Sequence, residues 1–231
     1  MAAQAPLTAH VRVPATSANL GPGFDSLGLA LALHNEVTAR EADDVVVRVE
    51  GEGAGRLPGG ADNVVARGVR LAYEAAGRPF KGCLIGCHNR IPPARGLGSS
   101  AAAWVGGLAA GNALLGGPLT REALLALAAR AEGHPDNVAA AVLGGLTVSG
   151  ARGDTVIAVA LPVPPGLRWI ALVPRVTSAT AEARAVLPAS VPRADAVFNV
   201  QRVALLLAGL QAGRPDVLAA ALEDRLHEPY R

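Results

Sequence analysis

Lysine, cysteine, methionine and aromatic residues are all scarce in this chain of 231 residues. Lys81 is the only lysine, and aromatic residues make up 3% of the sequence. The arginines are spread along the chain without a block of five or six, so we expect neither nucleic acid nor a membrane as a partner. A phosphate site in this protein must therefore be built from arginine, backbone amides or a metal.

Charged residues are also few, at 17% against roughly 25% in an average soluble domain, whereas 51% of the residues are hydrophobic. This composition argues against disorder, and the length allows one large domain or two small ones. The most apolar stretch, residues 101–115, is shorter than the roughly 20 apolar residues that span a bilayer, so we expect a buried helix there. The first ten residues do not resemble a signal peptide.

Cys83 and Cys87 are the only cysteines. Four residues apart on an extended segment, they would be separated by about 13 Å, which is too far for a disulfide. We therefore expect free thiols, a reducing environment and a cytoplasmic location.

The apolar pattern predicts strands and helices that do not strictly alternate, which is typical of the α+β class. Strands are expected at residues 11–13, 45–50, 83–87, 156–160 and 169–173, the last two paired with each other. Helices are expected at residues 63–76, 101–115, 119–132, 194–210 and 215–227, with caps at Asp62 or Asn63 and at Thr120. A composition break near residues 150–154 suggests two domains, 1–152 and 153–231.

The most informative segment is residues 92–102, PPARGLGSSAA, where a strand ends, glycines follow and an alanine-rich helix begins. Backbone amides and the positive end of the helix dipole would face this loop, as in many phosphate sites. A Walker loop is excluded because no lysine precedes the serines, and the prolines argue against a dinucleotide fingerprint. A structural loop whose serines only cap the helix is the remaining alternative.

Two further segments are unusually polar. In residues 132–137, EGHPDN, Asp136 or Asn137 would cap a helix starting at Val138 under the simplest interpretation. Glu132 is different, because a nucleotide would repel it unless Mg²⁺ lay between them, and Mg²⁺ prefers oxygen ligands such as the Ser100 hydroxyl and a carboxylate. Residues 14–25, PATSANLGPGFD, suit a surface turn or a site for a small polar ligand.

Taken in order, these three segments resemble those of the galactokinase, homoserine kinase, mevalonate kinase and phosphomevalonate kinase (GHMP) superfamily. The opening VPATSANLGPGFDSLGLAL and the run EGHPDNVAAAVLGG resemble the homoserine kinases within it most closely. The resemblance covers the chain from about Val11 to Arg231. It implies a two-domain α+β fold and transfer of the γ-phosphoryl group of ATP to the side-chain hydroxyl of L-homoserine, a step of threonine biosynthesis.

The same resemblance implies roles for individual residues. The nucleotide would lie against Pro92, Pro93, Ala94, Arg95, Gly96, Leu97, Gly98, Ser99, Ser100, Ala101 and Ala102, with Asn63 near the adenine, and Ser100 and Glu132 would hold Mg²⁺. Homoserine would contact Asn19, Asp25, His134, Asp136, Thr180, Arg184 and Arg231, the last through the substrate carboxylate. Asp136, Asn137 and Arg184 would act at the transferring phosphoryl group, with Asp136 either accepting a proton or only binding the substrate amine.

The chain also departs from the family pattern. Homoserine kinases continue beyond the EPYR segment into another glycine-rich motif, so a truncated second domain is expected, with a non-catalytic nucleotide-binding relative as one alternative. A sister kinase acting on a hydroxyl substrate such as mevalonate is another, although His134 and Arg231 suit an amino acid better. Arg95 replaces a small residue and is expected to point to solvent. A homodimer is the oligomer that the resemblance implies.

Overall fold

The computed structural model describes residues 7–173 and 180–231, without the side chains of residues 180 and 181. Its strands form one sheet in the order β3-β4-β2-β5-β6, and β1 pairs with β2 as well. The strands are β1 (Thr8–Ala18), β2 (Leu27–Glu41), β3 (Val45–Gly51), β4 (Cys83–Asn89), β5 (Leu146–Arg152) and β6 (Thr155–Leu161). The β3–β4 pair is parallel, and the other pairs are antiparallel.

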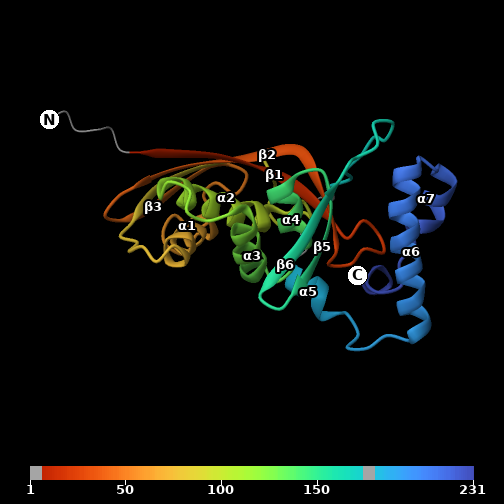
Figure 1. The fold of residues 1–231 in the computed structure, drawn as a ribbon. Helices are drawn as coiled ribbons and strands as arrows, with labels where there is room; N and C mark the ends of the chain where they lie inside the picture. Colours follow the sequence, from red (N-terminus) through yellow and green to blue (C-terminus); the bar gives the residue numbers. More distant parts are fainter. Residues whose placement is uncertain (1–6, 174–179) are drawn as a thin grey trace.

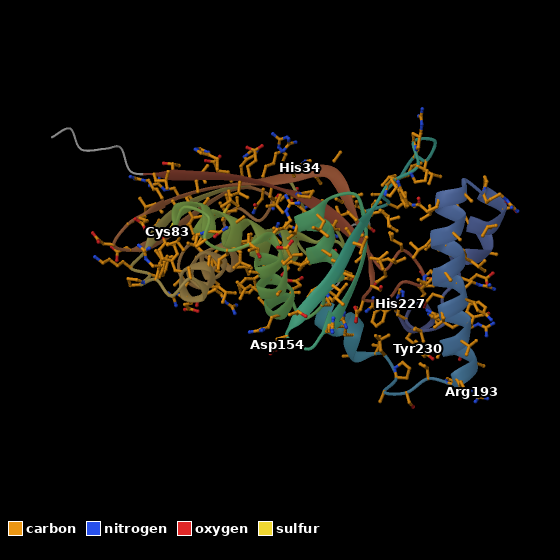
Figure 2. The ribbon with its side chains drawn as sticks, viewed as in Figure 1. His34, Cys83, Asp154, Arg193, His227 and Tyr230 are labelled. Atoms are coloured by element: carbon orange, nitrogen blue, oxygen red, sulfur yellow. The ribbon has the colours of Figure 1, made fainter. Side chains whose placement is uncertain are left out.

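The helices lie in two groups around this sheet (Figure 1). They are α1 (Val64–Ala75), α2 (Ser99–Leu114), α3 (Arg121–Glu132), α4 (Asp136–Leu143), α5 (Thr180–Ala185), α6 (Arg193–Ala212), α7 (Pro215–Ala221) and a 3₁₀ turn at Glu228–Tyr230. Figure 1 shows α1 to α4 on the same side of the sheet, whereas α6 and α7 lie beyond the β5–β6 end. His34 lies on the face that α1 to α4 leave open (Figure 2). The fold is therefore α+β, as predicted.

Local signals in the sequence correctly placed several helix ends. The Asn63 side chain accepts a hydrogen bond from the Val65 amide at 2.9 Å and caps α1. The Thr120 hydroxyl accepts one from the Ala123 amide at 3.2 Å and caps α3. Gly133, with a φ of 96°, ends α3 in the left-handed conformation that glycine adopts readily.

The strand pairing in the folded protein differs from other predictions made from the sequence. β1 continues to Ala18 because Thr16, Ser17 and Ala18 pair with β2, so the predicted loop at residues 14–25 begins later than expected. The expected pairing of residues 156–160 with residues 169–173 is wrong, because β6 pairs with β5, which the sequence did not predict. Residues 169–173 form no strand.

The predicted last helix is too long. Helix α7 ends at Ala221, because the carboxylate of Asp224 accepts the amides of Leu226, His227 and Glu228 at 3.1, 2.7 and 2.8 Å. These bonds close a turn that competes with a continued helix. The two-domain division remains a prediction, and its boundary at residue 153 falls in the turn of the β5–β6 hairpin.

Within residues 7–173 and 180–231, no helix combines the length and hydropathy needed to cross a membrane.

Both cysteines lie on β4 with buried, unbridged thiols, and burial raises the pKa of Cys83 and of Cys87 to about 11. A thiol reacts as its thiolate, so we expect neither cysteine of the folded protein to react with a disulfide reagent near pH 8. Both should react once the chain is unfolded in urea. Spectrophotometric thiol counting with and without urea checks this, and rapid labelling of the native protein would contradict it.

Candidate active site

The glycine loop joins β4 to α2 in a left-handed path. Ala94, Gly96 and Gly98 have φ values of 56°, 70° and 65°, and Gly98 is the N-cap of α2. The cap has no side-chain hydrogen bond, so the serines that follow do not cap the helix as the structural alternative supposed. The first turn of α2 therefore presents its backbone amides and the positive end of its dipole to the loop.

Thr16 connects this loop to the rest of the site through hydrogen bonds. Its side chain is fully buried, its amide donates to the Leu97 carbonyl at 3.1 Å, and its hydroxyl donates to Asn137 Oδ1 at 2.8 Å. One strand residue thus connects the glycine loop to the first turn of α4. Sequence reasoning assigned Thr16 to a polar turn and missed this role, which depends on a partner 121 residues away.

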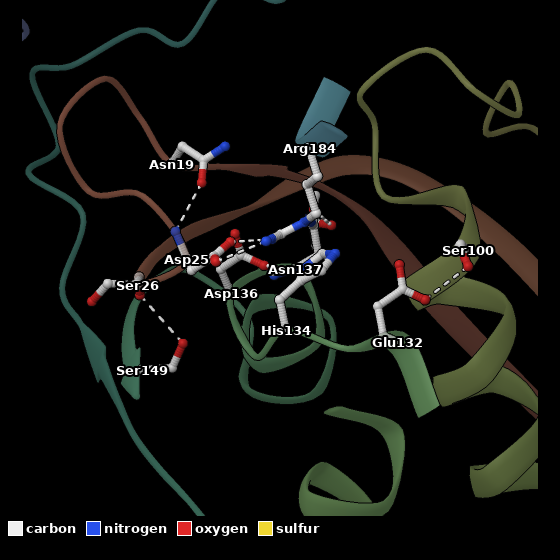
Figure 3. A network of polar contacts seen from close by, with 11 residues as sticks. Asn19, Asp25, Ser26, Ser100, Glu132, His134, Asp136, Asn137, Ser149 and Arg184 are labelled. Carbon is white, nitrogen blue, oxygen red and sulfur yellow. Dashed lines mark hydrogen bonds and ion pairs between the residues drawn. The ribbon is translucent and has the colours of Figure 1, made fainter. Parts of the chain in front are cut away.

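The predicted Mg²⁺ ligands lie next to each other. The Ser100 hydroxyl donates to Glu132 Oε2 at 2.7 Å, although the two residues are 32 positions apart (Figure 3). Ser100 belongs to the first turn of α2, and Glu132 is the last residue of α3. A hydroxyl and a carboxylate, both hard oxygen groups, therefore meet at the mouth of the glycine loop.

His134, Asp136 and Asn137 form a second polar group at the start of α4. Asp136 Oδ1 lies 2.6 Å from His134 Nδ1 and accepts the Asn137 amide at 2.7 Å. Helix α4 begins at Asp136, two residues earlier than expected, and its N-cap is Pro135, so neither Asp136 nor Asn137 fills the capping position. The hydrogen bond to Asp136 outweighs burial and raises the pKa of His134.

The pH dependence of stability follows from this shift. The pKa of His134 in the folded protein lies above the value of about 6.5 in the unfolded chain, so the folded state holds the imidazole proton more tightly. The His134–Asp136 pair therefore stabilises the fold fully below about pH 6.5. This contribution is lost as the pH rises through the raised pKa of His134. We expect His134→Gln to lower the urea midpoint more at pH 6 than at pH 9. Equal losses at the two pH values would contradict this assignment.

An ion pair from a distant segment completes the polar cluster. Arg184 on α5 donates to both carboxylate oxygens of Asp25, with Nη1 3.0 Å from Oδ2, and Asn19 Oδ1 accepts the Asp25 amide at 3.0 Å. Figure 3 shows this guanidinium reaching from α5 toward Asp25 and Asp136. Ligand atoms of Asp25, His134 and Asp136 lie within 4.8 Å of one another. Each carboxylate of this group already has a partner, since Asp25 pairs with the Arg184 guanidinium and Asp136 contacts the His134 imidazole.

Two cavities bring the predicted residues together. One of about 400 Å³ is lined by Asn19, Asp25, Ala94, Arg95, Gly96, Leu97, Gly98, Ser99, Ser100, Glu132, His134, Asp136, Asn137, Arg184 and Arg231, among others. A smaller one of about 200 Å³ is lined by Asn63, Pro93, Ala94, Ser99, Ser100 and Ala102 among others, so the cavities share three residues of the loop region. Arg95, expected to point to solvent, is half-buried and lines the larger cavity.

Some predicted residues lie elsewhere. The Ala101 side chain is fully buried in the core beneath α2, and Pro92 lies beside the loop without lining either cavity. The side chain of Thr180 lies outside the described part of the chain. Phe24, which sequence reasoning missed, contacts Arg184 and Arg231. The sequence did offer one signal for Phe24, its rarity. The chain has 3 phenylalanines, and this one lies in a polar loop directly after Gly23 and before Asp25.

Known proteins are similar to this chain in sequence and fold. Residues 63–145 match the family described as the GHMP kinases N terminal domain. The chain is 49% identical over 221 residues to a homoserine kinase of Moorella thermoacetica, covering 96% of this chain and 75% of that protein. The chain belongs to the homoserine kinase family. A second homoserine kinase, from Symbiobacterium thermophilum, is 51% identical over 233 residues, covering 96% of this chain and 72% of that protein.

Solved structures agree with the family assignment. The crystal structure of a homoserine kinase from Cytophaga hutchinsonii superposes with a TM-score of 0.82 at 32% identity, covering all of this chain and 76% of that one. The phosphomevalonate kinase of Streptococcus pneumoniae shares the fold, with a TM-score of 0.68, but only 11% of the sequence, covering 94% of this chain and 77% of that one. The chain thus spans about three quarters of the homoserine kinases it matches, and its sequence separates it from the sister kinase.

Proposed function

We propose that this chain catalyses transfer of the γ-phosphoryl group of ATP to the side-chain hydroxyl of L-homoserine, forming O-phospho-L-homoserine. The supporting observation is one cavity in which a glycine loop and a hydroxyl–carboxylate pair meet a cluster of two carboxylates, an imidazole and a guanidinium. The first group suits a nucleotide, and the second suits a zwitterionic amino acid. Identity of 49% to a homoserine kinase favours this pairing of substrates.

The nucleotide has two neighbouring places to lie. Backbone amides of the first turn of α2 suit the phosphates, and Arg95 brings a cation to the same cavity. The smaller cavity has apolar walls that include Val49, Leu57 and Val64, which suit an adenine ring. Asn63 lines that cavity, while its side chain is held by the Val65 amide and by the Pro58 carbonyl, which accepts from Nδ2 at 2.7 Å.

Ser100 and Glu132 fit the ligand chemistry of Mg²⁺, because both offer hard oxygen atoms and their side chains already meet at 2.7 Å. We propose that these two residues hold the ion with the nucleotide. When bound, Mg²⁺ neutralises phosphate charge that would otherwise repel the acceptor hydroxyl and the Glu132 carboxylate.

Homoserine fits the charged cluster by complementarity. Its ammonium group suits the carboxylates of Asp25 and Asp136, and its carboxylate suits the guanidinium groups of Arg184 and Arg231. Arg231 donates Nε–H to the Ala183 carbonyl at 3.2 Å, which leaves its Nη donors to face a substrate. The acceptor hydroxyl would then lie toward the glycine loop.

Asp136 is better suited to binding than to proton abstraction. Its Oδ1 lies 2.6 Å from the imidazole of His134 and accepts the Asn137 amide at 2.7 Å, and hydrogen bonds to a carboxylate weaken it as a base. Asn137 Oδ1 accepts from Thr16, so the group that Asn137 offers a ligand is its Nδ2. We therefore propose direct transfer, in which orientation and charge neutralisation supply the rate enhancement.

The test is ADP release by the purified chain with Mg·ATP and each of five conditions: L-homoserine, L-serine, L-threonine, mevalonate and no acceptor. We expect acceptor-dependent ADP release with L-homoserine and formation of O-phospho-L-homoserine by mass spectrometry. Equal release with every acceptor, or ATP binding without any release, would contradict the proposed transfer. Preferential release with mevalonate would indicate the sister activity instead.

A further inference from the structure

Phe24 lies where three segments that are far apart in the sequence meet. The Cζ atoms of Arg184 and Arg231 lie 5.3 and 5.1 Å from the centroid of its ring. The imidazole ring of His227 stacks on it, with centroids 5.0 Å apart and 24° between the planes. One aromatic ring therefore contacts two of the guanidinium groups that line the larger cavity, those of Arg184 and Arg231.

The ring is held in place by the segment after α7. His227 is only 5% exposed, and its Nε2 donates to the Gly21 carbonyl at 2.8 Å. Asn199 on α6 donates Nδ2–H to the Pro22 carbonyl at 3.2 Å. Figure 2 shows His227 between the end of the sheet and α6. The loop that carries Phe24 is thus hydrogen-bonded both to α6 and to the segment after α7.

We propose that Phe24 is a positioning residue that orders Arg184 and Arg231 for the acceptor substrate. This role rests on the proposed function, because it takes the two guanidinium groups as the partners of the substrate carboxylate. Phe24 itself does not line the larger cavity, so it acts through the arginines.

An aromatic ring suits this task for a physical reason. The negative face of the ring attracts a guanidinium group without using any of its N–H donors. Arg184 thereby keeps its donors for Asp25, and Arg231 keeps its Nη donors for an anion. Each arginine side chain otherwise has many accessible rotamers, so ordering it before the substrate arrives favours binding.

The test compares three variants in steady-state kinetics. Phe24→Leu keeps apolar bulk but removes the aromatic face, and we expect kcat/KM for L-homoserine to fall about tenfold, as expected for two lost cation–π contacts. The KM for ATP should change less than about twofold, since neither arginine is assigned to the nucleotide base. Phe24→Tyr retains the aromatic ring, and the half-buried position leaves room for the added hydroxyl, so this variant should keep most of the wild-type kcat/KM. Equal impairment of the Leu and Tyr variants would overturn the proposal.

Phe198 supplies a matched control. Its ring also contacts two guanidinium groups, those of Arg202 and Arg225, at 4.2 and 3.9 Å, but it does not line the larger cavity. Phe198→Leu should therefore leave kcat/KM for L-homoserine unchanged at temperatures where the variant is folded. A loss equal to that of Phe24→Leu would show that general destabilisation, not positioning, explains the effect.

A second readout separates this proposal from the proposed function. The ¹⁵N order parameters of the Nε–H groups of Arg184 and Arg231, assigned with Arg184→Lys and Arg231→Lys, should fall in Phe24→Leu and recover in Phe24→Tyr. This holds whichever acceptor the enzyme uses, because it measures the arginines directly. Wild-type protein that is inactive with L-homoserine would refute the proposed function alone, whereas unchanged order parameters would overturn the role of Phe24.

Discussion

Replacement of Glu132 by alanine is expected to lower ATP-dependent turnover at least about a hundredfold while the protein stays folded. The carboxylate lies 2.7 Å from the Ser100 hydroxyl at the mouth of the glycine loop, where a nucleotide would otherwise repel it. Its removal would take away the carboxylate that we propose as a Mg²⁺ ligand there. The fold should tolerate the change, because the hydrogen bond is exposed and Glu132 is the last residue of α3.

Two further substitutions of Glu132 separate the effect of its charge on turnover from the effect of its shape. Glu132→Gln keeps the size and loses the charge, so we expect it to be as inactive as the alanine variant, whereas Glu132→Asp should keep part of the activity. Glu122→Ala, on an exposed residue in the first turn of the same helix, is the matched control and should leave turnover unchanged. Measured ADP release, with urea unfolding to verify the fold, decides the matter. Full activity of Glu132→Ala would remove Glu132 from the site.

Gly98→Ala is expected to damage both stability and activity, and far more than Gly96→Ala. A Cβ atom at Gly98 would lie 2.0 Å from the Thr16 hydroxyl oxygen and 3.0 Å from Asn137 Oδ1. Thr16 is fully buried and cannot turn away without losing its bond to Asn137. At Gly96 the added Cβ would meet no atom within 4 Å.

The two glycines share a left-handed backbone, with φ values of 70° and 65°, so alanine costs about 1 kcal/mol at either position from conformation alone. Overpacking adds a further cost at Gly98, and we expect a total loss of about 2 to 4 kcal/mol in the free energy of unfolding. Displacement of the loop should lower kcat/KM for ATP by at least about tenfold. Urea unfolding and ADP release of both variants measure these effects.

A double-mutant cycle identifies the clash as the cause. Thr16→Ala removes the hydroxyl oxygen that the new methyl group would meet, so Gly98→Ala should be less destabilising in the Thr16→Ala background than in the wild type. Strictly additive losses would show that the left-handed backbone alone explains the effect. Similar losses for Gly96→Ala and Gly98→Ala would lead to the same conclusion.

The glycine loop and the helix ends could be predicted from the sequence because their signals are local. Asn63 and Thr120 bond to amides two and three residues away, and Gly133 needs only its own backbone freedom. The chemical character of the loop is equally local, since glycines and a helix start within a few residues present amides to an anion. The order of the three polar segments also carried the resemblance to homoserine kinases.

Local sequence signals could not predict contacts between residues that are far apart in the sequence. Phe24 and His227 gain their neighbours only when the segment after α7 folds back on the loop at residues 19–25. The short α7 depends on Asp224 bonding to three amides instead of leaving the helix to continue. Strand β6 pairs with β5. Nothing in the residues of β6 indicates that its partner is β5 and not residues 169–173.

The sequence by itself determined the α+β class, the caps of α1 and α3 and the family, and it predicts an anion-binding loop at residues 92–102. The tertiary structure decided which polar groups face each other: Ser100 with Glu132, Thr16 with Asn137 and Arg184 with Asp25. The physical reason is range. A cap or a tight turn is stabilised by atoms within a few residues, whereas each of these pairs spans between 32 and 159 positions and forms only after the sheet and helices have packed.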